Sequence, residues 1–227
     1  MQDGVTRILP EPSAPDARYD AACRRCTRLA TFRDDVKRQH PDYWCKPVPP
    51  FGARDARLVI VGLAPGMHGA NASGRPFTGD YAGILLYQTL FDFGYANQPT
   101  GSSVGDGLVL TGCRINNSVK CLPPDNKPLP VEMANCNSYL AADLASVAPG
   151  AALLALGRIA HDAALRALEL KASAFPFAHG VMHRIDRTTG EIALFDSYHC
   201  SRYNTNTGRL TVPMFRSVFE SIGAYLQ

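Results

Sequence analysis

Short apolar runs alternate with amphipathic stretches along most of the chain. A short apolar run is typical of a buried strand, whereas apolar positions three and four residues apart are typical of a helix. The predicted strands cover residues 58–61, 108–115, 151–156, 181–187 and 192–197, and the predicted helices cover residues 84–93, 131–147, 158–168 and 213–225. Because strands and helices alternate, the pattern predicts an α/β fold with a mostly parallel sheet.

The most unusual stretch is residues 62–80, which joins the first predicted strand to the first predicted helix. It contains five glycines and two prolines, which indicates backbone conformations that few other residues allow. In an open α/β sheet, ligands bind at the carboxyl ends of the strands, and this loop follows such an end. The sequence therefore predicts that residues 62–80 approach a ligand closely.

The composition is that of a globular protein, with 227 residues of which 46% are hydrophobic and 19% charged. We expect a single domain over residues 21–227, preceded by a polar, mobile arm over residues 1–20. The net charge of +3 permits a nucleic-acid partner without arguing for one. Since we find neither a signal peptide nor a membrane-spanning run, we expect a cytoplasmic location and no membrane partner.

Seven cysteines in a reducing compartment do not form a disulfide framework, so some of them need another explanation. Cys23 and Cys26 lie two residues apart, in a stretch that looks helical as far as residue 36. With Cys121 and Cys136 they make a four-thiolate set, which suits zinc or an iron–sulfur cluster. Only one pair is closely spaced, which favours [4Fe–4S]. The alternative that Cys121 and Cys136 are buried core thiols stays open.

Three sequence blocks, together with these four cysteines, carry a resemblance to a known family. The blocks are the glycine-rich loop at residues 62–80, the segment at residues 117–128 and the segment at residues 198–205. From Cys23 to Thr211 the chain resembles the family 5 uracil-DNA glycosylases, the UDGb branch of the uracil-DNA glycosylase superfamily. The resemblance implies a three-layer α/β/α sandwich with a central, mostly parallel four-stranded sheet. It also implies a structural [4Fe–4S] cluster on Cys23, Cys26, Cys121 and Cys136.

The resemblance implies a DNA repair enzyme that flips a damaged base out of the helix and hydrolyses its bond to the sugar. Its substrates would be uracil and other deaminated bases in single- and double-stranded DNA, and its product an abasic site. No lysine occupies the motif positions expected to face the sugar, so we expect a monofunctional, monomeric enzyme, at the nucleoid if the source is prokaryotic. The alternatives are a non-catalytic iron–sulfur protein that binds nucleic acid or transfers electrons, and a zinc-bound structural module.

Two residues are candidates for binding the flipped base. Phe77, in the glycine-rich loop, would stack on it, as an aromatic residue does in similar enzymes. Asn117 occupies the position that reads uracil in similar families, and an amide held one way round matches the N3–H donor and O4 acceptor of uracil. The structural alternatives are a core phenylalanine and an asparagine that caps a turn.

Three residues are candidates for bond cleavage, which leaves a cationic sugar and an anionic base. Asp80 would hold the attacking water or stabilise the cation, although it could instead cap the helix beginning near Tyr81. His199 would donate to the base O2, and a neutral imidazole suffices for that. Asn126 resembles a position implicated in positioning or catalysis, with a turn residue as the alternative.

The remaining candidates would contact DNA or line the pocket. Backbone N–H groups from Gly66 onward could bind phosphates, and His68 and Asn71 rank second as lining residues. Tyr203, beside Arg202, would fill the space that the flipped base leaves in the duplex. The cationic side chains in or beside the blocks are Arg75, Lys120, Lys127, Arg202 and Arg209, each of which could also be ordinary surface charge.

Overall fold

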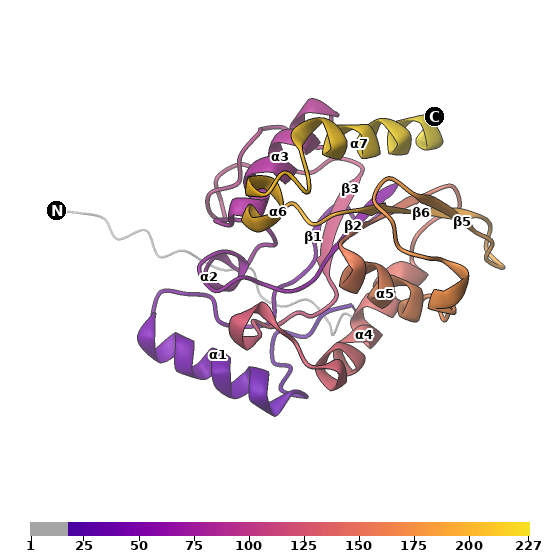
Figure 1. Cartoon of the computed structure of the whole chain (residues 1–227). Coiled ribbons are helices and arrows are strands. Elements are labelled where there is room, and N and C mark those ends of the chain that lie inside the picture. Colours follow the sequence, from indigo (N-terminus) through magenta and orange to yellow (C-terminus); the bar gives the residue numbers. More distant parts are fainter. Residues whose placement is uncertain (1–17) are drawn as a thin grey trace.

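A computed structural model of the protein describes residues 18–227, so most of the predicted arm lies outside the described residues. One six-stranded sheet runs through the described chain in the order β1-β3-β2-β4-β6-β5 (Figure 1). The strands are β1 (Phe51–Gly52), β2 (Leu58–Gly62), β3 (Cys113–Asn117), β4 (Ala152–Leu156), β5 (Met182–Ile185) and β6 (Ile192–Ser197). The four central strands are parallel, and each edge carries one antiparallel strand. The predicted fold class is confirmed, with the two edge strands added to the parallel four.

Helices cover both faces of the sheet and give the molecule its three layers (Figure 1). The helices are α1 (Thr27–Gln39), α2 (Ala70–Ser73), α3 (Tyr81–Asp92), α4 (Pro130–Ala145), α5 (Arg158–Ala167), α6 (Arg202–Asn206) and α7 (Val212–Leu226), with short 3₁₀ turns η1 (Pro124–Asn126) and η2 (Ala172–Ala174). Helices α3 and α7 pack on one face, and α4 and α5 pack on the other. None of the described helices is long and apolar enough to cross a membrane.

The strands are apolar on both sides because each face of the sheet is covered. In β2, Leu58 and Ile60 belong to the core beneath α3 and α7, whereas Val59 and Val61 belong to the core beneath α4 and α5. Side chains alternate between the faces of a strand, so one continuous apolar run supplies both cores. This is why the predicted strands appeared as unbroken apolar runs.

Among the predicted element boundaries that differ from the structure, two have an identifiable cause. Cys26 is the residue before α1, so Cys23 and Cys26 precede the helix rather than lying inside it. The strand predicted from residue 108 begins at Cys113, because Leu110 pairs only through an isolated bridge to Ala96. Apolar residues that pack beneath a helix from a loop have the same composition as a strand, so periodicity alone does not separate them.

The carboxyl ends of the parallel strands meet at one edge of the sheet. Gly62, the last residue of β2, stands opposite Asn117, the last residue of β3. Leu156 of β4 pairs with Ser197 of β6 at the same edge. The glycine-rich loop and the segments after β3 and β6 therefore start side by side, where α/β sheets bind ligands.

Candidate functional site

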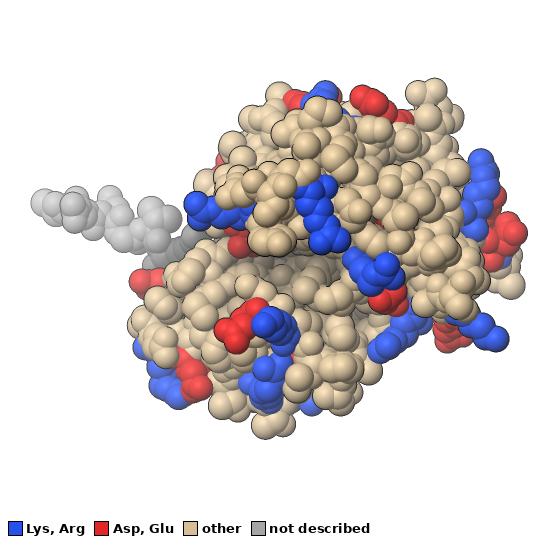
Figure 2. Space-filling view, in the orientation of Figure 1, with Lys and Arg blue, Asp and Glu red and all other residues tan. Residues whose placement is uncertain are grey.

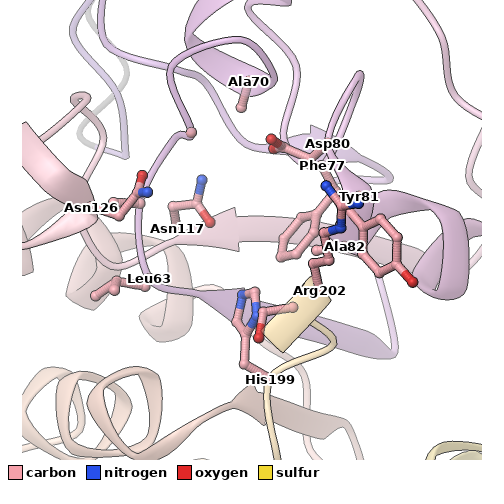
Figure 3. Close-up of a pocket in the computed structure, with 13 residues that line it drawn as sticks. Leu63, Ala70, Phe77, Asp80, Tyr81, Ala82, Asn117, Asn126, His199 and Arg202 are labelled. Carbon is pink, nitrogen blue, oxygen red and sulfur yellow. The ribbon is translucent and has the colours of Figure 1, made fainter. Parts of the chain in front are cut away.

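A pocket of about 360 Å³ opens at this edge of the sheet (Figure 3). Its walls come from the glycine-rich loop, the start of α3, the end of β3, the η1 turn and the segment after β6. The lining residues are Leu63, Ala64, Gly66, Ala70, Phe77, Asp80, Tyr81, Ala82, Asn117, Asn126, His199, Ser201 and Arg202. The structure thus brings together seven of the sequence-predicted site residues from all three sequence blocks.

Asp80 lies in the glycine-rich loop with its carboxylate against two glycines. A Cβ at Gly69 would lie 1.9 Å from Asp80 Oδ1, and one at Gly66 would lie 2.8 Å from it. Burial raises the pKa of Asp80, and a hydrogen bond from the backbone N–H of Ala70 opposes that rise. Asp80 precedes α3, but its side chain makes no capping hydrogen bond there. The carboxylate is therefore turned into the loop and the pocket rather than onto its own helix.

Phe77 reaches the pocket from a strained turn. Its φ is +55°, in the left-handed region that bulky residues rarely adopt. A Cβ at Gly83 would lie 1.9 Å from the Phe77 carbonyl oxygen, and one at Gly62 would lie 3.0 Å from the ring. The ring stacks at 6.0 Å from the ring of His199, with an interplanar angle of 26°. Gly62 thus makes room for the ring and Gly83 for the Phe77 backbone, a function that the sequence did not reveal.

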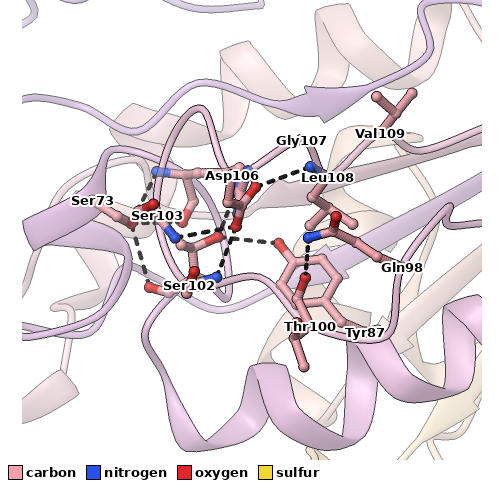
Figure 4. A network of polar contacts seen from close by, with 12 residues as sticks. Ser73, Tyr87, Gln98, Thr100, Ser102, Ser103, Asp106, Gly107, Leu108 and Val109 are labelled. Carbon is pink, nitrogen blue, oxygen red and sulfur yellow. Dashed lines mark hydrogen bonds and ion pairs between the residues drawn. The ribbon is translucent and has the colours of Figure 1, made fainter.

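A network of buried polar contacts holds the turn that carries Phe77 (Figure 4). The guanidinium of Arg75 makes two hydrogen bonds to the carboxylate of Asp106 and a third from Nε to Thr78 Oγ1. Asp106 also accepts hydrogen bonds from the backbone N–H groups of Ser102, Ser103 and Leu108. Arg75 holds the pKa of Asp106 well below its usual range. Arg75 is thus committed to the protein interior, so the expectation that it contacts DNA is wrong.

Asn117 presents its amide to the pocket from the end of β3 (Figure 3). The residue is only 3% exposed, yet among the described residues its side-chain amide has no hydrogen-bond partner. A Cβ at Gly62 would lie 2.5 Å from Asn117 Oδ1, so only glycine fits beside the amide. Because the amide lines the pocket, its donor and its acceptor are open to a ligand.

Polar contacts behind Asn117 fix the end of its strand. Lys120 Nζ donates to the backbone carbonyl of Asn117 at 3.1 Å and to the side chain of Asn116. The amide of Asn116 in turn donates to Asp143 at 2.7 Å, and Asp143 pairs with Arg114 at 3.1 Å. Lys120 is 1% exposed, and burial lowers its pKa to about 8. The expectation that Lys120 contacts DNA is therefore wrong.

His199 lies at the opposite wall, two residues beyond β6. Burial lowers its pKa to about 4, so the imidazole is neutral at pH 7. The side chain of Asn204 donates to the His199 backbone carbonyl at 2.8 Å, and Ser201 caps α6 through the Asn204 backbone N–H. The predicted loop after β6 thus contains a short helix that fixes His199.

Asn126 and Arg202 complete the rim of the pocket. Asn126 is exposed in the η1 turn, where both it and Asp125 have a positive φ. Arg202 opens α6, and its guanidinium lies 5.7 Å from the ring of Tyr81. Tyr81 also lines the pocket, although sequence reasoning did not select it; its place directly after Asp80 was the available signal.

Three predicted residues lie outside the pocket. His68 is exposed and bonds Tyr43 through its Nδ1 at 2.9 Å. Asn71 is fully buried behind the loop, where its amide donates to Cys45 Sγ at 3.4 Å. Tyr203 is 71% exposed on α6, beside the pocket rather than in it. Exposure leaves Tyr203 available to a large ligand.

The face that carries the pocket is hollowed and basic. Figure 2 shows lysine and arginine side chains on both sides of the central hollow, with fewer acidic side chains between them. Of the predicted cationic contacts, Lys127, Arg202 and Arg209 are exposed. Such an arrangement favours a polyanion over a neutral ligand.

The four predicted ligand cysteines gather in one place. Cys121 and Cys136 are buried in a small core between α1 and α4, and Cys23 and Cys26 pack against it. All the described cysteines are free thiols. Burial raises the pKa of Cys121 to about 12, and the other three cysteines add to that rise. A bound metal centre would remove this penalty, because it stabilises the thiolate.

Two observations test whether these cysteines fit a cluster. Arg33 is 3% exposed and its Nε and Nη1 lack partners, while it interacts electrostatically with Cys121. An anionic group beside the thiols would supply the missing charge. In addition, no three cysteine sulfurs among the described residues lie within 4.8 Å of one another. A single zinc ion draws its thiolates closer together than this, so the arrangement is not that of a closed zinc site.

Comparison with known proteins agrees with this site. The family model of the Uracil DNA glycosylase superfamily matches residues 49–223. A type-5 uracil-DNA glycosylase of Thermus thermophilus is 44% identical over 202 residues, which cover 87% of this chain and 90% of that protein. One of Pyrobaculum aerophilum is 41% identical over 206 residues, covering 89% of this chain and 88% of that protein. The chain therefore belongs to the uracil-DNA glycosylase superfamily, and within it to the type-5 uracil-DNA glycosylases.

Proposed function

We propose that this protein excises uracil and other deaminated bases from DNA by hydrolysis and leaves an abasic site. The observation that carries the proposal is the amide of Asn117 at the end of β3, which lines a pocket with Phe77, Asp80 and His199 and has no partner among the described residues. The relatives bear the name of this enzyme, and the non-catalytic alternative is not favoured. As a monofunctional glycosylase the protein breaks only the bond from base to sugar.

Asn117 reads the base and Phe77 stacks on it. Uracil donates N3–H to the amide oxygen and accepts from the amide NH₂ at O4, whereas cytosine presents the reverse pattern. Each mismatched buried polar group costs roughly 1–3 kcal/mol, which discriminates between bases without absolute selectivity. The contacts behind Asn117 hold its strand, so the amide is oriented before the base arrives.

Asp80 and His199 act at the two sides of the bond that breaks. Water adds to the anomeric carbon of the sugar, and the bonding electron pair leaves with N1 of the base. The Asp80 carboxylate stabilises the cationic sugar or orients the water, and the water proton passes to solvent or to the departing base. Neutral His199 donates a hydrogen bond to O2 of the base as negative charge develops there. Asn126, on the rim, positions the substrate.

The cysteine set holds a structural [4Fe–4S] cluster in this proposal. Cys23, Cys26, Cys121 and Cys136 are the ligands, and Arg33 balances the negative charge. When bound, the cluster links four positions of the chain through bonds to their sulfurs. It takes no part in the hydrolysis. Cytoplasmic conditions keep its thiolates reduced.

DNA lies across the basic face around the pocket. Gly66 and the backbone that follows it approach the phosphates, although the Ala70 N–H is already engaged by Asp80. Lys127, Arg202 and Arg209 supply a salt-dependent contribution to affinity. Exposed Tyr203 fills the vacated stack in duplex DNA. The monomer acts at the nucleoid on both single- and double-stranded substrates.

The test is excision from an oligonucleotide that carries one uracil, followed by alkali to cleave abasic sites. We expect strand scission at the uracil with the wild-type protein, and a large loss with Asn117→Ala. Asn97→Ala, which alters an exposed asparagine that does not line the pocket, is the matched control and should retain activity. No scission in either single- or double-stranded DNA would rule out the proposal.

A further inference from the structure

A second group of titratable side chains lies on the opposite side of β6 from the α3 and α7 core. It contains His161 of α5, His183 of β5 and Asp196 of β6, whose ligand atoms all lie within 4.8 Å of one another. Asp196 follows the alternation of Ile192 and Leu194, so it points to the face that α5 covers. None of the three lines the pocket described above.

The three side chains are buried in apolar surroundings. The side chains of His161 and Asp196 are 1% and 0% exposed, and that of His183 is 11% exposed. The rings of Phe175 and Phe177 pack edge-on against His183 and His161, respectively. A carboxylate in such a place needs full compensation by hydrogen bonds or by a cation.

Both nitrogens of His161 face hydrogen-bond acceptors. Its Nε2 lies 2.8 Å from the Phe175 carbonyl oxygen, and its Nδ1 lies 2.7 Å from Asp196 Oδ1. Since Nε2 donates to the carbonyl, Nδ1 of a neutral His161 would turn a lone pair toward the carboxylate. The contact therefore requires a cation, which is either a proton between the two atoms or a metal ion that binds both of them from one side. A backbone carbonyl that accepts from the second imidazole nitrogen is the usual support of a metal-ligating histidine.

A proton on His161 leaves two other atoms of the group unexplained. Asp196 Oδ2 and His183 Nε2 are both buried without a hydrogen-bond partner, and they lie 3.6 Å apart. One ligand atom of each of the three residues lies within 4.8 Å of those of the other two. A metal ion accepts electron pairs from all of these atoms at once, which a proton on His161 does not.

We propose that His161, His183 and Asp196 bind one divalent transition-metal ion, for which zinc is the best fit. Two imidazoles and one carboxylate are ligands that zinc takes readily, and it completes four-coordination with water or the second carboxylate oxygen. The ion links α5, β5 and β6. It therefore joins the hairpin at the sheet edge, formed by β5 and β6, to the helix layer that contains α5. Asp196 lies three residues before His199 along the chain. An ion bound to Asp196 therefore also stabilises the end of β6, from which His199 emerges.

The experiment titrates cluster-loaded protein with Zn²⁺ against a chromogenic chelator and measures zinc and iron together by mass spectrometry. We expect one zinc per chain, with unchanged iron content and cluster absorbance. Asp196→Asn and His183→Gln should each weaken zinc binding by more than the roughly 10–100-fold that loss of a supporting partner costs. Zinc should raise the melting temperature of the wild type, as any ligand of the native state does, but not that of either variant.

His40→Gln, which alters a histidine elsewhere on the molecule, is the control and should bind zinc like the wild type. His183 lies on the edge strand β5, and His183→Gln leaves the His161–Asp196 pair in place, so this variant should fold. It therefore tests the site even where Asp196→Asn folds poorly. The proposal is overturned when the cluster-loaded protein keeps its iron but binds no zinc. It is equally overturned when zinc displaces iron and persists in both variants, because the cysteines are then the site.

Discussion

At the scale of single residues, the position of Asp80 depends on two glycines that face its carboxylate. Gly66 and Gly69 leave the space into which the carboxylate fits, and Ala70 supplies the N–H that binds it. The carboxylate is therefore held by backbone atoms rather than by side chains. Backbone contacts of this kind tolerate little displacement.

Gly69→Ala should impair catalysis while the protein stays folded. The new Cβ would lie 1.9 Å from Asp80 Oδ1 and displace the carboxylate, and a misplacement of about 1 Å can cost roughly 100-fold in rate. Single-turnover excision rates and thermal melting measure the two effects separately. Gly223→Ala in α7, where a Cβ meets nothing within 4 Å, is the control and should stabilise the helix by up to about 1 kcal/mol. Equal rates in the two variants would contradict the inferred position of Asp80.

The pH dependence of excision should reflect Asp80 rather than His199. The pKa of His199 is lowered to about 4, so this residue is neutral from about pH 5.5 upward and does not titrate near its usual value of about 6.5. The pKa of Asp80 is raised by burial, so activity should fall as pH decreases through that raised value and the carboxylate loses its charge. His199→Gln should lower the rate without moving this limb, whereas Asp80→Asn should remove it. An inflection near pH 6.5 that disappears in His199→Gln would contradict this assignment.

Several residues that line the pocket were predictable from the sequence blocks, but the groups that contact them in space were not. Phe77, Asn117, Asp80 and His199 were selected from their blocks, and the structure brings all four to one pocket. The glycines of residues 62–80 were expected to let a ligand approach closely, whereas Gly62, Gly66 and Gly69 make room for site side chains. Sequence spacing gives the chain position of a glycine but not the atom that occupies the space beside it.

At the scale of elements, the loop at residues 98–109 and the turn before α3 are held together by one ion pair. The side chains of Arg75 and Asp106 are 6% and 9% exposed, and they lie 31 positions apart in the sequence. Nothing in the sequence near either residue indicates its partner. For the same reason Arg75 and Lys120 were taken as surface charges, because a buried charge becomes recognisable only when its partner is known.

Asp106→Ala should destabilise the protein by about 3–5 kcal/mol, since it leaves the Arg75 guanidinium buried without a partner. Urea unfolding followed by circular dichroism measures this change. Asp34→Ala removes an exposed partner of Arg24 and should cost far less. Because the pKa of Asp106 is lowered in the folded state, the pair stabilises the protein fully at pH values above the usual aspartate pKa. The difference in unfolding free energy between variant and wild type should shrink as the pH falls below that value. Equal effects of the two substitutions would show that the buried pair contributes no more than the exposed one.

At the scale of the whole molecule, the parallel sheet and its helix layers followed from the alternation of apolar runs and amphipathic stretches. The cysteine set required distant parts of the chain to meet. The residues alone suggested this set but left core thiols as an alternative, and the resemblance implied the full set. The group of His161, His183 and Asp196 was not anticipated at all, because its members lie on three elements without a shared motif. Long-range convergence is a property of the topology and leaves no local pattern.

Cys136→Ser should remove the cluster and lower the melting temperature by well over ten degrees, because metal-binding energy contributes directly to folding. Iron content and visible absorbance report the cluster, and a thermal scan reports stability. Cys113→Ser, at a buried cysteine in the main core, is the control and should keep its iron although it also loses stability. Full iron content in Cys136→Ser would show that this cysteine is not a ligand.

The segment that carries Asn126 begins at Cys121 and ends at Cys136, and Asn117 lies just before it. One wall of the pocket is therefore tethered at both ends by residues proposed to bind iron. The order of that wall, and with it the ability to recognise damaged bases, should follow iron supply in the cell. Iron starvation or oxidative attack on the cluster would then reduce repair at the same time as it increases the need for repair.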